Sequence, residues 1–162
     1  MICVMLVSYL EIYIEDVWIE MGRKNPSIIK DLTIDAKRLM ETASMEDLHL
    51  EVLEALSDWS RAHVPSGGPK KWAKKLHDMG ARTVDKAAIA ALQELYDVRN
   101  LIVHQRSTVS RAHERDYPKS GLVAGKQLII SYPQLKDWLS ALTKLAEGIE
   151  AFSARYAVRK DE

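Results

Sequence analysis

Three side chains suited to phosphate chemistry lie within six residues of one another. Arg99 and Asn100 are adjacent, and His104 ends the run Arg-Asn-Leu-Ile-Val-His. A guanidinium binds phosphate oxygens through a planar fork of N–H groups, and an imidazole can exchange a proton near neutral pH. Arg99 and His104 are therefore candidate catalytic residues for breaking a phosphodiester bond, and Asn100 could orient either the imidazole or the phosphate.

The apolar spacing around this run predicts one long helix, which starts at Thr83 or Asp85 and ends near Gln105. Arg99 falls inside the apolar stripe of that helix. It must find a partner or line a cleft, because an unpaired buried guanidinium is very unfavourable. Five residues separate Arg99 from His104, which places them about 140° apart around an ideal helix. A cleft beside the helix end could receive both.

Four further residues are candidates for supporting this site. Asp97 shares a helix face with the asparagine and the histidine at spacings of three and four. Glu11 is a possible partner of Arg99, although a solvated or structural acid is the interpretation that we favour. Arg106 and Arg111 follow the run, and we expect them to belong to a basic rim that contacts the phosphate backbone of a substrate.

Composition excludes several classes of protein. The chain has 162 residues, and 23 basic side chains balance 23 acidic ones, which argues against a polybasic DNA-wrapping protein. The single Cys3 excludes an internal disulfide. The remaining histidines lack ligand spacing, and the glycine-rich stretch near residue 67 lacks the pattern of a phosphate loop. We expect neither a metal nor another cofactor.

Helical periodicity dominates the rest of the chain and predicts an all-α fold. We expect five or six helices in an up-down bundle, a long irregular loop at about 106–126, and at most one short extended piece at 126–131. Residues 1–158 would form a single domain, and the tail 159–162 would fray. The apolar stretch 1–10 is half a membrane span, so we expect a cytoplasmic protein with no membrane association.

Expected helices can be placed from start and stop signals. The first would run from about Ile2 to Met21, with Gly22 ending it. Its apolar stripe would contain Ile2, Leu6, Tyr9, Tyr13 and Val17. Ser27 and Ser44 would cap the second and third, and Pro133 would lie in the first turn of the last. A fourth helix would cover about residues 70–79.

The run from Arg99 to His104 resembles the Arg-polar-x-x-x-His motif of HEPN domains, the higher eukaryote and prokaryote nucleotide-binding superfamily. The stretch Ser8-Tyr9-Leu10-Glu11-Ile12-Tyr13 also looks like the opening helix of that family, and the last amphipathic helix is similar too. The chain departs from the pattern after the histidine. Similar sequences often have a glycine there, and this one reads Gln105-Arg106-Ser107.

The resemblance implies a helical bundle that dimerises. In active members the motif helices of two subunits meet and form one composite, metal-independent endoribonuclease site. Arg99 and His104 would be catalytic and Asn100 would assist, acting on RNA within a homodimer. The protein would be a toxin or defence ribonuclease with an antitoxin protein as partner. Two alternatives remain open from the residues. One is a non-catalytic helical module that binds RNA, a nucleotide or a protein, and the other is a purely structural domain.

Overall fold

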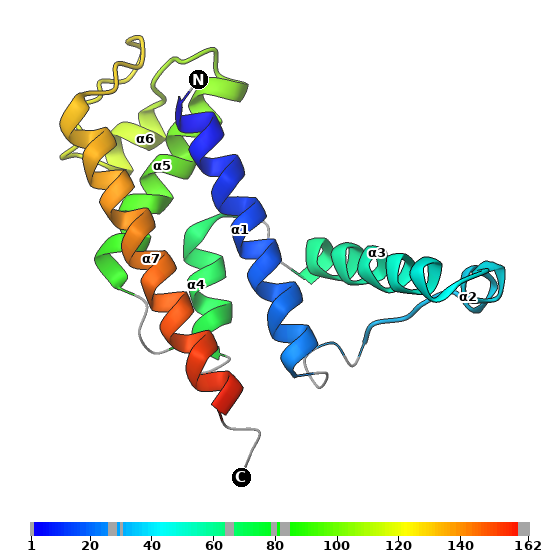
Figure 1. Ribbon diagram of the computed structural model, residues 1–162. Helices are drawn as coiled ribbons and strands as arrows, with labels where there is room; N and C mark the ends of the chain where they lie inside the picture. Colours follow the sequence, from blue (N-terminus) through cyan, green and yellow to red (C-terminus); the bar gives the residue numbers. More distant parts are fainter. Residues whose placement is uncertain are drawn as a thin grey trace. The chain divides into compact units, whose positions relative to one another are not determined.

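The structure, a computed structural model, describes residues 2–25, 29, 31–63, 67–78, 81 and 85–158. These residues form seven helices and no strand (Figure 1). The predicted all-α class is confirmed, but the expected number of helices, five or six, is too low. The helices are α1 (Ile2–Lys24), α2 (Ala36–Glu41), α3 (Met45–His63), α4 (Pro69–Asp78), α5 (Lys86–His104), α6 (Arg111–Asp116) and α7 (Tyr132–Val158). Within these ranges, no helix combines the length and the apolar character needed to cross a membrane.

Contacts divide the chain into two compact units. The larger unit comprises Met1–Leu10 and Ser66–Glu162, and the smaller unit comprises Glu11–Pro65. The single domain expected over residues 1–158 stays a prediction, and the expected tail at 159–162 lies outside the described residues.

The core of the larger unit forms around α5. This helix packs against both α7 and α4, and Figure 1 shows α5 and α7 side by side. Both helices contribute side chains that are almost fully buried: Leu92, Leu95, Val98, Trp138, Leu145 and Ile149. The long motif helix is therefore packed on by both α7 and α4.

The smaller unit is built on the second part of α1. The Ser60 hydroxyl on α3 donates a hydrogen bond of 3.3 Å to the carbonyl of Glu15 on α1. Trp18 is 2% exposed on α1, and Trp59 is 7% exposed on α3. The short α2 packs on α3, where Arg38 forms ion pairs with two glutamates.

The buried face of α1 differs from the expected stripe, which contained Ile2, Leu6, Tyr9, Tyr13 and Val17. Ile2 and Tyr9 are 59% and 64% exposed. The buried residues are instead Cys3, Val7, Leu10, Ile14, Trp18 and Met21. Apolar side chains surround the first turns of α1 on most sides, so periodicity alone allowed more than one stripe. Burial raises the pKa of the Cys3 thiol.

Gly22 does not end α1, contrary to the sequence prediction. The helix continues to Lys24. A Cβ atom on Gly22 would lie only 2.6 Å from Cγ2 of Ile29. The glycine is therefore explained by the close approach of the following segment, and not by a helix stop.

Two predicted caps are confirmed and one helix is displaced. The backbone N–H of Asp47 donates to Ser44 Oγ at 3.0 Å, and that of Ala87 donates to Asp85 Oδ1 at 2.8 Å. The second helix was expected to begin after Ser27 and to carry Ile28, Leu32 and Leu39. Ser27 lies outside the described residues, and 32–35 are not helical. Asp35 accepts a hydrogen bond from Lys37 N at 2.8 Å, so α2 begins only after this later cap.

The segment at 106–126 is more ordered than predicted. It contains α6, whose N-cap Ser110 accepts a hydrogen bond of 3.1 Å from His113 N. Six residues are too few for helical periodicity to show, which explains the error. The extended piece expected at 126–131 is reduced to an isolated antiparallel bridge between Thr108 and Gln127.

Candidate active site

Helix α5 positions the three motif residues. Its inner face is pinned by Leu92, Leu95, Val98 and Leu101, all at most 4% exposed. Arg99 and Asn100 lie beside this face and are half-buried, whereas His104 is the exposed last residue of the helix. The structure thus brings the motif to the final turns of a well-anchored helix.

The Arg99 guanidinium binds its neighbour and retains spare donors. Nη1 donates a hydrogen bond of 3.1 Å to Asn100 Oδ1. Nε is buried and has no hydrogen-bond partner among the described residues. A buried donor without a partner is unfavourable by about 1–3 kcal/mol, which an anion at this position would relieve. The prediction that Asn100 orients the site has a physical basis in this contact, although the group oriented is the guanidinium.

His104 lies at the carboxyl end of α5, where the last carbonyls face outward. Five residues of ideal helix place its Cα about 7.5 Å along the axis from that of Arg99. The imidazole is exposed. It can therefore reach a bound molecule without any rearrangement of the core.

Asp97 belongs to a different network on the same helix. One carboxylate oxygen accepts a hydrogen bond of 3.2 Å from Gln93 Nε2, and the other accepts one of 2.5 Å from the Tyr117 hydroxyl. Gln93 Oε1 in turn accepts the backbone N–H of Lys70, at 3.1 Å, from the first turn of α4. Asp97 thus ties α4 and the end of α6 to the motif helix.

Burial dominates the electrostatics of this network. It raises the pKa of Tyr117, and the hydrogen bond to Asp97 raises it further. His113 is 4% exposed and packs against Tyr117 with ring centroids 4.7 Å apart. Burial lowers the pKa of His113, while Asp97 and Asp116 oppose this shift. Its Nε2 atom has no hydrogen-bond partner within the described part of the chain.

Sequence reasoning missed Tyr117 and His113. Both were placed in an irregular loop, where no periodicity brings them towards α5. The signal that could have placed His113 is Ser110, because a serine three residues earlier is a typical helix cap.

The turn after α5 sets the positions of the predicted basic rim. Arg106 and Ser107 have φ angles of 51° and 61°, in the left-handed region that favours glycine. Ser107 N donates to the carbonyl of Leu101 at 3.0 Å, which closes the helix end. Arg106 is exposed in this turn, and Arg111 is exposed at the first position of α6.

Backbone hydrogen bonds join residues 107–109, which lie between the two rim arginines, to residues 125–128. Val109 N donates to the Lys126 carbonyl at 3.0 Å, and Leu128 N donates to the Ser107 carbonyl at 2.7 Å. The backbone between Arg106 and Arg111 is therefore fixed at the end of α5. The contact of these two arginines with a substrate stays a prediction.

Two other site predictions concern Glu11 and metals. Glu11 lies in the smaller unit, so its support of Arg99 stays a prediction. Within the described residues, no group of three or more His, Cys, Asp or Glu side chains is arranged to hold a metal ion.

Comparisons of the chain with family models, with curated proteins and with solved structures found no match. The likeness to HEPN domains therefore depends on the motif and its helical context.

Proposed function

We propose that this chain is a metal-independent endoribonuclease of HEPN type, with Arg99 and His104 as the catalytic residues. The observation that carries the proposal is the half-buried Arg99, whose Nε lacks a hydrogen-bond partner among the described residues and which forms no ion pair with any of them. A structural arginine in an apolar stripe would be expected to bind a carboxylate. This one keeps donors for an external anion.

The chemistry follows from the two side chains. RNA carries its own nucleophile, the 2′-hydroxyl. Its oxygen attacks the adjacent phosphorus, the bond to the 5′-oxygen breaks, and a 2′,3′-cyclic phosphate and a 5′-hydroxyl result. One proton leaves the 2′-hydroxyl and one is delivered to the 5′-oxygen, which are roles for imidazoles. The guanidinium stabilises the negative charge on the phosphoryl oxygens.

Two protons at opposite sides of one phosphorus call for more than one histidine. The exposed His104 at the end of α5 supports a composite site, in which a second copy of the chain supplies its own motif. The proposal therefore includes a homodimer in which the two α5 ends meet, and a helical bundle of HEPN type as its scaffold. A toxin or defence role, with an antitoxin protein as partner, is the biological setting that this activity fits.

The deciding experiment incubates purified protein with single-stranded RNA in EDTA and measures cleavage. We expect cleavage by the wild type, and a loss of about 10²–10⁴-fold in His104→Ala. Arg99→Lys should also lose activity, because lysine lacks the planar fork. His49→Ala changes an exposed histidine of the smaller unit and serves as the matched control.

Three outcomes would overturn this function. They are cleavage that disappears on chelation, cleavage that survives His104→Ala, and RNA binding without any cleavage. The last outcome would favour the non-catalytic module.

A further inference from the structure

A second surface lies at the opposite end of α5 from the motif. It is a groove of about 450 Å³ between α4 and α5, here named the lysine groove. Its rim carries Lys70, Lys74 and His77 from α4, and Lys86 from α5, while Ile89 and three alanines form its floor. Eighteen residues of helix, about 27 Å, separate Lys86 from His104, so the groove is distinct from the candidate active site.

The three lysines of this groove are not paired with acids in the part of the chain that the structure describes. None of the described residues that line the groove carries a carboxylate, and the three ammonium groups form no ion pair with described residues. The nearest acids along the sequence are Asp85, which caps α5 and lies 3.8 Å from Lys144, and Asp78, whose carboxylate lies 4.0 Å from the ring of His77. The groove therefore has an apolar floor between two rims of unpaired lysines. A helix that carries an apolar side chain between acidic ones would complement it.

Charge is strongly separated along the chain. Residues 11–65 contain twelve acidic and six basic side chains, whereas residues 1–10 and 66–162 contain eleven acidic and seventeen basic ones. The chain is neutral overall only because the two units compensate each other. Each unit thus offers a surface that attracts the other unit of a second copy.

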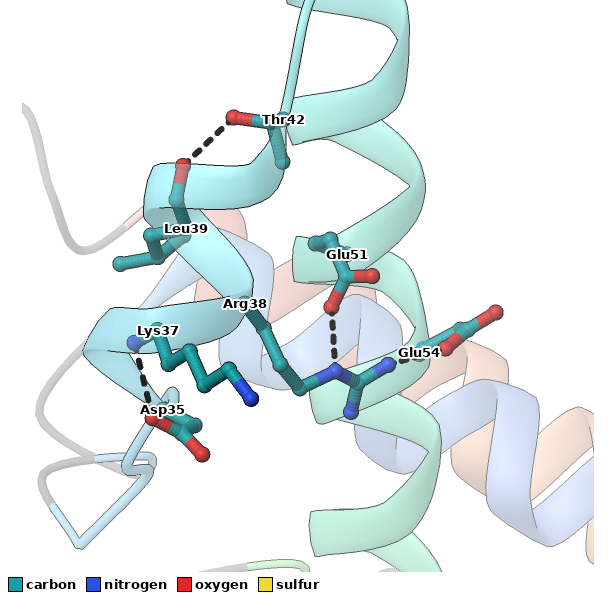
Figure 2. A network of polar contacts seen from close by, with 7 residues as sticks. All are labelled: Asp35, Lys37, Arg38, Leu39, Thr42, Glu51 and Glu54. Atoms are coloured by element: carbon teal, nitrogen blue, oxygen red, sulfur yellow. Dashed lines mark hydrogen bonds and ion pairs between the residues drawn. The ribbon is translucent and has the colours of Figure 1, made fainter.

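The smaller unit has an acidic hollow with an exposed leucine at its edge. This hollow, of about 320 Å³, is lined by Arg38 and by acids that include Asp47, Glu51 and Glu54. Arg38 lies between two of them, with its Nε 2.9 Å from Glu51 and its Nη2 2.7 Å from Glu54 (Figure 2). Leu50 also lines the hollow and is 58% exposed.

The spacing on α3 suits the lysine groove. Leu50 follows Asp47 by three residues and precedes Glu54 by four, so all three share one face of the helix. Asp47 and Glu54 are about 10.5 Å apart along the axis, close to the 8–10 Å that separates two packed helices. A helix that crosses the groove would therefore bring one acid to each lysine rim and the leucine to the apolar floor.

We propose that the lysine groove binds the acidic face of α3, centred on Leu50, from a second copy of this chain. In a twofold dimer each copy supplies one groove and one acidic face, so the contact is made twice. No Phe, Tyr or Trp is found among the described residues that line the groove, so it offers few of the platforms on which single-stranded nucleic acids stack, which favours a protein helix as the occupant. This inference does not depend on ribonuclease activity.

Sedimentation velocity of the full chain at low and high salt tests the contact. We expect the wild type to associate at low ionic strength. The average mass of the sedimenting species should fall as salt screens the charges. The double change Lys70→Glu with Lys74→Glu should weaken association by about tenfold or more, since each lost contact becomes a repulsion. Lys71→Glu with Lys75→Glu makes the same charge change on exposed residues of α4 outside the groove, and should leave the mass unchanged.

A charge exchange makes the test specific for the proposed occupant. Asp47→Lys with Glu54→Lys should also abolish the contact between the lysine groove and the acidic face. An equimolar mixture of this variant with the Lys70→Glu, Lys74→Glu variant should recover the mass of the wild type. Leu50→Ser keeps every charge and should still weaken association, and circular dichroism verifies that each variant is helical.

The proposal is overturned by any of three results. These are a wild type that sediments as a monomer at all salt and protein concentrations, an unchanged mass for the groove variant, or a mixture that does not recover. A fall in mass that stops at a dimer, with RNA cleavage unchanged, would leave the proposed function intact, whereas cleavage by a monomeric variant would overturn its composite site.

Discussion

Asp97 is the residue at which α4, α5 and the end of α6 are joined. Tyr117 donates to it from the far end of α6, and Gln93 connects it to the start of α4. A carboxylate with two donors is stabilised in place, and each donor removed leaves a half-buried acceptor with less compensation.

We expect Tyr117→Phe to lower the free energy of unfolding by about 1–2 kcal/mol, because the Asp97 carboxylate loses one of its two donors. Urea denaturation followed by circular dichroism measures the change. Tyr132→Phe removes a hydroxyl from a side chain that is 77% exposed and should have no effect. Equal stability of the two variants would show that the Asp97 hydrogen bond contributes nothing.

His113 predicts a pH dependence of stability. Burial lowers its pKa in the folded protein, so the unfolded chain binds the proton more readily. Its contribution to the free energy of unfolding is then fully present above about pH 6.5 and is lost as the pH falls below that value.

The corresponding measurement is the free energy of unfolding between pH 5 and 8 for the wild type and for His113→Phe. The variant should show a shallower decline towards acid, since the ring contact with Tyr117 is kept and the titrating group is gone. His104→Gln, which changes an exposed imidazole, should keep the decline of the wild type. A decline of the same slope in His113→Phe would refute this assignment.

At the scale of elements, the end of α5 is held in an unfavourable backbone conformation. Ser107 has a positive φ of 61°, which is unfavourable by about 1 kcal/mol for a residue with a Cβ. We expect Ser107→Gly to raise the free energy of unfolding by about 0.5–1 kcal/mol, measured by thermal and urea denaturation. Ser107→Ala retains the Cβ and is the control, because it should give no gain.

At Gly22 of α1 we expect the opposite, namely that replacing the glycine lowers the free energy of unfolding. Alanine favours helix over glycine by about 1 kcal/mol in a helix interior. Here the added Cβ would meet Ile29 at 2.6 Å, so we expect Gly22→Ala to lower the free energy of unfolding by about 1–3 kcal/mol. Restoration of stability by Gly22→Ala with Ile29→Ala would support the clash, whereas a stabilised single variant would exclude it.

The elements show where sequence reasoning succeeds and where it fails. Caps are local, so Ser44 was predicted correctly from a few residues, and Asp85 was one of the two predicted starts of the motif helix. The buried face of α1 depends on the segments that pack against it. The need for glycine at position 22 depends on the close approach of Ile29. Neither contact can be read from a few neighbouring residues. Both ends of the motif helix were predicted to within a few residues, because the cap signal at Asp85 and the apolar spacing of the helix indicate the same extent. Tyr117 was missed because its partner Asp97 is twenty residues away.

At the scale of the whole molecule, the two compact units predict independent effects. Tyr117 acts through Asp97 in the larger unit, and Gly22 acts through Ile29 in the smaller one. Since these pairs share no partner, we expect the changes in unfolding free energy of Tyr117→Phe and Gly22→Ala to add within about 0.5 kcal/mol in the double variant. Urea denaturation of the two single variants and the double variant checks this. A larger departure would reveal coupling between the units.

The lone thiol of this protein offers a means of following the motion of its first helix. Cys3 is 3% exposed, and burial raises the pKa of its thiol. A maleimide can therefore reach the sulfur only when the first turns of α1 open, and the labelling rate in native buffer reports the free energy of that opening. No second cysteine competes for the reagent, so the wild-type chain already carries a single-site probe of local unfolding.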